Sequence, residues 1–432
     1  MRIGNGQLAR HVHSGAERMT AAPAAPGRAA FIFIFVTVLL DMLALGIIIP
    51  VLPRLIVTFR GGDTASAATI YGVFGAAYAA MQFLFSPVLG SLSDRFGRRR
   101  VILLSCAGLG LDYALMALAP SLWWLLVGRI VSGITASTYG TASAYIADIV
   151  PPGQRAAKFG MLGVAFGIGF IVGPSVGGIL GSVWLRGPFW CAAILSLANT
   201  AYGFFVLPES LPVERRSPFR WRSAHPLGAF RMLRAHPQLL TLTAAAFLAN
   251  LAHDAAPSTF VLYSTWRYGW NERTVGLVLG LVGAASMIVQ GGLVGRIVAA
   301  LGERRALAFG YLCGAAGNAL FGFAATGAWF LAAIPVTAFF GVASPAMQSM
   351  LTRRVGADEQ GRLQGAQGSM MGIASMTAPI LFTQVFAAAV GPYRDWNLPG
   401  APFLIAAGLL AGAVAIALRV SPRGAEPRGG VE

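Results

Sequence analysis

Long apolar runs separated by short polar gaps dominate the pattern along the chain. A bilayer core needs roughly 20 mostly apolar residues per helix. Twelve runs are long enough: 30–53, 68–90, 101–119, 121–144, 157–180, 188–207, 237–263, 274–295, 305–324, 328–350, 362–388 and 400–419. The pattern therefore predicts an all-α membrane protein with twelve transmembrane helices.

Composition agrees with this prediction. Of the 432 residues, 56% are hydrophobic and 11% are charged, against about 25% charged residues in an ordinary soluble chain. A water-soluble enzyme is thereby excluded, and no catalytic residues are expected. The three cysteines lie inside apolar runs without metal-ligand spacing, so no metal site and no disulfide framework is expected. The phosphate-binding pattern GxxxxGK[ST] is absent and Lys158 is the only lysine. An ion gradient is thus the expected energy source, with the proton as coupling ion and no cofactor.

The formal charge of +16 marks topology and not a nucleic-acid partner, because the basic residues lie in the gaps and form no single basic face. One alternating set of gaps, with both termini, holds 25 Lys and Arg residues; the other set holds six, Arg54, Arg60, Arg186, Arg267, Arg273 and Arg394. By the positive-inside rule both termini are cytoplasmic. The first run is interpreted as an uncleaved helix, since residues 1–29 contain no apolar stretch of their own.

An internal repeat divides the chain into two halves. A shift of 205 residues places Gly97 on Gly302, Arg99 on Arg304, Arg100 on Arg305, Gly160 on Gly365 and Pro174 on Pro379 without a gap. Two parallel six-helix repeats are typical of one large class of transporters. The predicted organisation is a cytoplasmic tail (1–29), a six-helix bundle (30–207), an Arg- and Pro-rich linker (208–236), a second bundle (237–420) and a cytoplasmic tail (421–432).

The gap after the second run reads GSLSDRFGRRR and resembles the cytoplasmic signature of the major facilitator superfamily. Glycines here permit a tight turn. Asp94 can meet a helix N-terminus or an arginine of the other half. Arg98 can pair with an acid such as Asp148 in the next cytoplasmic gap, and this ion pair would form a latch. The alternative is that the arginines only set topology. The predicted latch comprises Gly90, Asp94, Arg95, Gly97, Arg98 and Asp148.

The fifth run carries a glycine-proline pattern that matches the motif of proton antiporters in this superfamily. It favours export over import, because symporters generally lack it. The alternative is ordinary close helix packing through small residues. The motif residues are Gly160, Gly169, Gly173, Pro174, Gly177 and Gly178.

Ionisable residues within apolar runs form the candidate proton-coupling site: Asp41, Asp112, Arg129 and Asp254. An ionised group at the bilayer centre costs about 2.5–3.5 kcal/mol on insertion scales, so such groups usually pair or face a cavity. Asp41 and Arg129 are the expected partners, and Asp254, next to His253, is expected near the membrane exit. The alternative is a set of static structural ion pairs.

Segments of both halves are similar to bacterial tetracycline/proton antiporters, among them LDMLALGIIIPVLPRL (40–55), LDYALMALAP (111–120) and GRLQG (361–365). By this resemblance Asp41, Asp94, Asp112, Arg129 and Asp148 match functional positions of the family. The chain departs from it at Gly314, where those exporters have an acid, and at Ser286, where they have a histidine. These departures leave tetracycline itself open as the substrate.

The sequence thus predicts a monomeric drug:proton antiporter of the bacterial cytoplasmic membrane, with a small lipophilic substrate and membrane lipid as its partners. A proton-coupled importer of a metabolite and a non-transporting membrane receptor are the alternatives. Polar residues left in the runs are candidates for lining a substrate cavity: Gln82, Asn250, Gln290, Asn318 and Gln348.

Overall fold

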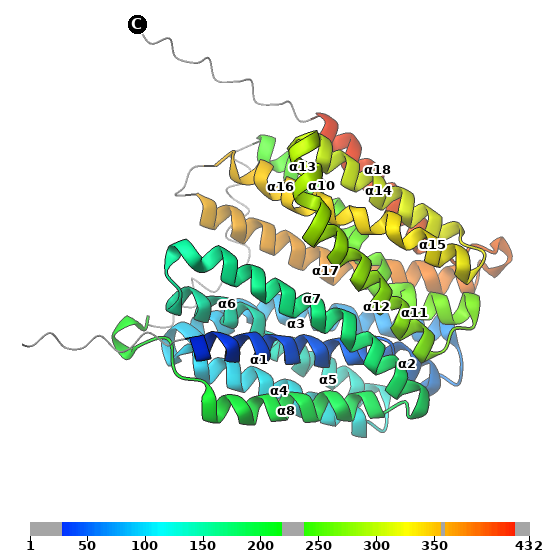
Figure 1. The fold of residues 1–432 in the computed structure, drawn as a ribbon. Helices are drawn as coiled ribbons and strands as arrows, with labels where there is room; N and C mark the ends of the chain where they lie inside the picture. Colours follow the sequence, from blue (N-terminus) through cyan, green and yellow to red (C-terminus); the bar gives the residue numbers. More distant parts are fainter. Residues whose placement is uncertain (1–27, 218–236, 356–358, 420–432) are drawn as a thin grey trace, which may run out of the picture.

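The computed structural model describes residues 28–217, 237–355 and 359–419, and every regular element in these ranges is helical (Figure 1). The first half contains α1 (Arg28–Ile48), α2 (Leu52–Phe59), α3 (Thr64–Phe96), α4 (Arg98–Leu118), α5 (Leu122–Thr135), α6 (Thr138–Ile149), α7 (Pro152–Val183), α8 (Gly187–Val206) and the short turn η1 (Val213–Arg215).

The second half contains α10 (Pro237–His253), α11 (Ala255–Tyr268), α12 (Glu272–Ile288), the π-helical turn η3 (Val289–Leu293), α13 (Val294–Leu301), α14 (Glu303–Phe323), α15 (Gly327–Ala338), the 3-10 turns η4 (Phe339–Val342) and η5 (Arg394–Trp396), α16 (Ala343–Thr352), α17 (Gln360–Val390) and α18 (Ala401–Arg419). The predicted tail 421–432, residues 1–27 of the other tail and residues 218–236 of the predicted linker lie outside the described residues.

Within the described ranges, eleven helices are long and apolar enough to cross a membrane. The twelfth, predicted over 121–144, is present but divided into α5 and α6 at Ala136 and Ser137. Small polar side chains here hydrogen-bond locally and compete with helical pairing. The Gln82 side chain donates to the free Ala136 carbonyl at 3.5 Å. The all-α, twelve-span fold is therefore confirmed, with one broken span.

Equivalent residues of the two repeats occupy equivalent places. Gly97 and Gly302 each connect two helices with a positive φ, 101° and 73°. Arg99 donates to the carbonyl of Phe204 near the end of the sixth span, and Arg304 does the same to Leu418 near the end of the twelfth. Pro174 lies inside α7, and its counterpart Pro379 lies inside α17. The 205-residue repeat is thus a structural repeat.

The halves touch at one end of the molecule and separate at the other. Helix α7 packs on α12, and α3 packs on α17. A Cβ added at Gly178 would lie 2.3 Å from the Glu272 carbonyl, and one at Gly72 would lie 2.0 Å from Thr383 Oγ1. Toward the end that carries Arg95–Arg100, the same addition at Gly160 or Gly90 meets nothing within 4 Å.

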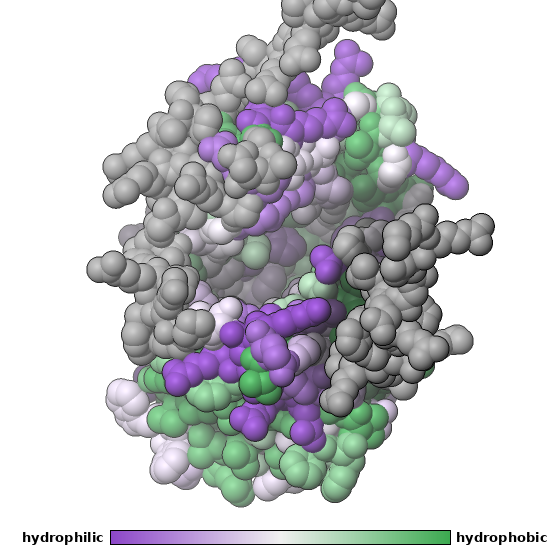
Figure 2. Space-filling model, turned by 90° about the vertical axis from the view of Figure 1, so that its left-hand side faces the viewer, coloured by the Kyte–Doolittle hydropathy of each residue, from purple (hydrophilic) through white to green (hydrophobic). Residues whose placement is uncertain are grey.

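We call that end the arginine-rich end. Figure 2 views it face on and shows a hollow between the upper and lower lobes, bordered by hydrophilic residues in purple. The molecule is therefore open toward its arginine-rich end and closed at the opposite end.

Candidate functional site

Three ionisable residues are buried among the helices of the first half. Asp41 on α1, Asp112 on α4 and Arg129 on α5 are 7%, 1% and 8% exposed. The predicted pair of Asp41 with Arg129 is wrong, since the described residues include no ion pair between them. The Arg129 guanidinium instead lies 5.4 Å from the Tyr78 ring centre and 3.5 Å from Ser132 Oγ. The first span meets the fourth mainly through α6, whereas Arg129 on α5 lies over Tyr78 of α3.

Asp112 is the acid adjacent to Arg129 along the α4–α5 contact. Its Oδ1 lies 2.7 Å from the position of a Cβ on Gly128. No hydrogen bond within 3.5 Å reaches either of its carboxyl oxygens or Arg129 Nε, although Ser132 and the charge of Arg129 lie close to the carboxyl. A buried polar group without a partner costs about 1–3 kcal/mol, and more when charged. This acid therefore has free acceptor sites for a proton or a substrate donor.

Asp254 lies at an interruption in the seventh span, between α10 and α11. Its Oδ2 accepts a hydrogen bond from Ser375 Oγ on α17 at 2.9 Å. It sits in the middle of the span Leu239–Tyr268, so the expected place near the membrane exit is wrong. The exposed His253 ring stacks on Phe340 at 5.7 Å. The structure places this acid in the second half, apart from the buried group of the first.

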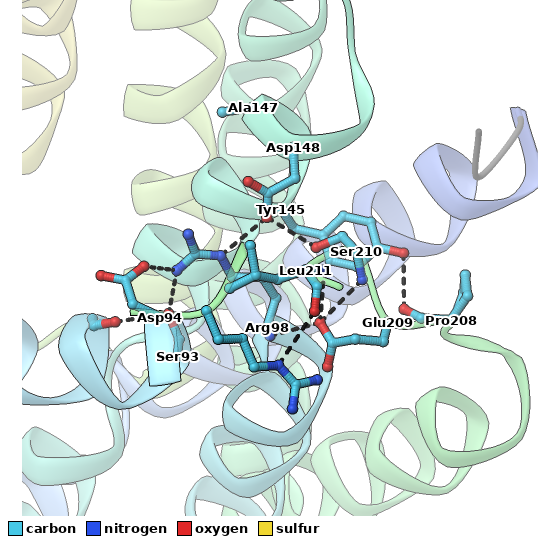
Figure 3. Close-up of polar contacts among 12 residues, drawn as sticks. Ser93, Asp94, Arg98, Tyr145, Ala147, Asp148, Pro208, Glu209, Ser210 and Leu211 are labelled. Carbon is cyan, nitrogen blue, oxygen red and sulfur yellow. Dashed lines mark hydrogen bonds and ion pairs between the residues drawn. The ribbon is translucent and has the colours of Figure 1, made fainter. Parts of the chain in front are cut away.

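The predicted latch contact between Arg98 and Asp148 is present (Figure 3). Arg98 Nε lies 3.1 Å from Asp148 Oδ2, while its Nη1 lies 2.5 Å from Asp94 Oδ1 and 2.6 Å from Ser93 Oγ. Asp94 thus pairs within its own half and with no arginine of the other half among the described residues. Arg98 ties the end of α3 to the end of α6.

Other predicted latch residues behave differently. Gly97 makes the turn between α3 and α4 with its positive φ, as expected. Gly90 does not, because it lies inside α3. The Arg95 guanidinium lies over the Phe96 ring at 5.0 Å and takes no part in the Arg98 cluster.

Glu209 is a latch residue that the sequence analysis missed. Its Oε1 accepts from the backbone N–H groups of Arg98, Ser210 and Leu211 at 2.8, 3.0 and 3.1 Å, so it caps the N-terminus of α4. Ser210 Oγ donates to Asp148 Oδ2 at 3.0 Å (Figure 3). An acid directly after the sixth span, inside an arginine-rich gap, was the available signal. The start of the linker is thereby fixed to the latch.

Residues of the glycine-proline motif take part in two different helix contacts of α7, one with α1 and one with α12. Added Cβ atoms at Gly169, Gly173 and Gly177 would meet the α1 backbone or side chains at 2.6, 2.8 and 1.9 Å. Gly178 faces α12 of the other half, and the Pro174 carbonyl lies 2.2 Å from the position of a Cβ on Gly276. The motif therefore permits close backbone approach both within the first half and between the halves.

The candidate cavity residues have mixed roles. Gln82 is bound to the Ala136 carbonyl, and the Asn318 amide donates to Gly314 of its own helix at 2.9 Å. Gln290 lies in the π-helical turn η3, a type of distortion frequent at functional sites, next to Gly341. Asn250 and Gln348 are half-buried on α10 and α16.

Gly314 has no room for an acid. A Cβ there would lie 2.7 Å from the Phe340 ring and 3.1 Å from Leu410. A carboxylate at this place would require Phe340 to move. The packing of Phe340 and Leu410 around Gly314 therefore accounts for the departure from the antiporter pattern at this position.

Comparison with known proteins identifies the family. The family model described as "Major Facilitator Superfamily" matches residues 34–379 and 268–432. The chain belongs to the major facilitator superfamily. It is accordingly a multi-pass membrane transporter of a small molecule and not an enzyme.

Two similar proteins indicate which branch of the superfamily the chain resembles. The class C tetracycline resistance protein of Escherichia coli is 39% identical, over 87% of this chain and 95% of that protein. The class G protein of Vibrio anguillarum is 37% identical, over 85% and 93%. The resemblance inferred from the sequence is confirmed.

Solved structures share the fold at low identity. The human organic anion transporter MFSD10 matches with a TM-score of 0.67 and 24% identity, covering 92% of this chain and all (100%) of that one. The nucleoside transporter NupG matches with a TM-score of 0.73 and 13% identity, covering 90% and 99%. At this identity the match concerns the fold alone.

Proposed function

We propose that the protein is a proton-coupled secondary transporter that exports a lipophilic drug or antibiotic by alternating access. The observation that carries the proposal is the Asp112 carboxyl, buried beside Arg129 without a direct ion pair, in a molecule that is open at one end only. An ionisable residue at membrane depth is a functional-site hypothesis by default, because its burial is costly. The similarity to tetracycline resistance proteins supports export over the uptake of a metabolite.

The hollow lies at the cytoplasmic face in this proposal, because the arginine-rich gaps and both termini are assigned to the cytoplasm by the positive-inside rule. A drug enters from there while protons arrive from the opposite side. Drug and proton then compete for the same buried acids, so that loading one releases the other. The transporter works as a monomer in the bacterial cytoplasmic membrane, with lipid around its apolar surface.

An ion pair between the halves lies at the closed end. Arg54 Nε on α2 lies 3.2 Å from Glu272 Oε1 at the start of α12. Glu272 is also the residue whose carbonyl faces Gly178. This pair must break when the cavity opens outward, so it serves as the outer gate of the transport cycle.

A drug-susceptibility panel in a pump-deficient host tests the proposal. Cells expressing the protein should tolerate at least one lipophilic compound at several times the concentration tolerated by empty-vector cells. Cells expressing Asp112→Asn at equal membrane abundance should not. A phenotype of proton-driven uptake would support the importer, and no phenotype with any compound would favour the receptor.

A further inference from the structure

Helix α7 has three distinguishable faces. Leu162, Ala165 and Gly169 are buried toward α1, and Gly167 with Ile171 faces α12 of the other half. A third face is exposed at helical spacing and has the apolar character expected for contact with lipid. It consists of Met161, Val164, Ile168 and Val172.

Two phenylalanines lie on the side of α7 opposite this lipid-facing stripe. At 100° per residue, Phe166 and Phe170 fall between the α1 face and the α12 face. Their rings are stacked 5.4 Å apart with an interplanar angle of 8°, and Phe166 is 41% exposed. An exposed ring between α1 and α12 faces the hollow between the halves and not the lipid.

Tyr139 joins them from the broken fourth span. It lies in the first turn of α6, is 44% exposed, and meets the Phe166 ring edge-on at 6.2 Å. Thr138, its neighbour, lies next to Asp41. Met42, the residue after Asp41, is the side chain that an added Cβ on Gly169 would meet. The aromatic group therefore lies beside the buried acid of α1, on the side of the open hollow.

We propose that Tyr139, Phe166 and Phe170 form a stacking subsite for a planar aromatic ring system in the exported compound. The inference rests on the proposed export function and names a substrate class for it. Aromatic pairs in offset-stacked or edge-on arrangements gain stabilisation beyond that of their buried area, so these rings favour a planar aromatic ligand over an aliphatic ligand of equal size. Met287 of α12, beside Gly167, extends the wall of the subsite into the second half with a polarisable thioether.

Equilibrium binding of ethidium, a planar aromatic dye, to the purified protein without a proton gradient tests the subsite. Phe166→Leu keeps an apolar side chain but removes the ring, so dye affinity should fall about threefold to tenfold. Phe166→Trp should retain it, and Tyr139→Ala should weaken it. Val164→Ala and Ile168→Ala, on the lipid-facing stripe, are matched controls and should change affinity less than twofold.

Unchanged affinity of Phe166→Leu would overturn the subsite, as would equal losses in the stripe controls or a parent protein that binds no dye. Failure of the export function has a different signature. Dye binding would then depend on Phe166 as described, while no compound drove proton movement in vesicles.

Discussion

At Gly178, the addition of a single methyl group should alter the transport cycle. A Cβ there would lie 2.3 Å from the Glu272 carbonyl oxygen and 2.9 Å from the Gly276 Cα, both backbone atoms of the other half. Backbone atoms of a packed helix cannot rotate away as a side chain does. Gly178→Ala therefore forces α7 and α12 apart, at the end of the molecule that is closed in this structure.

The cost of this overlap sets the size of the effect. Inserting a methyl group into a well-packed contact costs about 1–3 kcal/mol. The cost applies only while the two helices touch, so it favours the outward-open state in which they separate. A bias of that size changes the ratio of the two states about 5- to 150-fold.

The assay is the rate at which a single cysteine reacts with a membrane-impermeant thiol reagent. Val57 lines a small cavity between the halves with Arg54, Thr64 and Val261, and it suits the purpose once Cys106, Cys191 and Cys313 are replaced. Labelling of Val57→Cys from the outer side should rise at least fivefold in Gly178→Ala.

Two other motif glycines serve as controls. Gly177→Ala would place its Cβ 1.9 Å from the Ile47 carbonyl within the same half, so it should lower the thermal stability without opening the outer end. Gly160→Ala meets nothing within 4 Å and should change neither property. Parent-like labelling of Gly178→Ala would refute the inference that this contact closes the outer end.

Three further predictions concern the latch, the outer gate and the topology. Asp94→Asn removes a charge from the Arg98 cluster. We expect normal membrane abundance and a transport rate reduced at least tenfold, which corresponds to about 1.4 kcal/mol of activation free energy for the conformational change. Unchanged transport would mean that the motif only sets topology. Arg54→Gln and Glu272→Gln each remove the ion pair of the gate, so each should raise outer-side labelling of Val57→Cys; parent-like labelling in both variants would contradict the gate. Cysteine at Ser217 should label only from the cytoplasmic side and cysteine at Gly391 only from outside; the reverse would invert the assigned orientation.

Much of the fold was predictable because the bilayer requires long apolar helices, and their spacing is visible in the sequence. The 205-residue offset predicted equivalent residues, and the matching contacts of Arg99 and Arg304 follow it. The Arg98–Asp148 contact was also predictable, since two charges in neighbouring gaps on one side of the membrane have few other partners.

The features that the sequence did not predict depend on helix rotation and on local backbone hydrogen bonding. Arg129 and Asp41 lie on adjoining spans, but periodicity does not fix which way each helix turns its polar side chain. The break at Ser137 arises from local hydrogen bonds inside an apolar run, which a count of hydrophobic residues does not detect. Glu209 caps a helix more than a hundred residues earlier in the chain, a contact that only the assembled bundle brings about.

The central claim is that buried acids of the first half exchange a proton for the drug. In inverted membrane vesicles with an acidified lumen, adding an exported drug should release protons from the lumen of vesicles containing the parent. Asp41→Asn and Asp112→Asn should abolish this release while drug binding stays measurable, and Asp254→Asn should have a smaller effect. Proton release equal to the parent in both first-half variants would contradict the account, because these acids would then be structural.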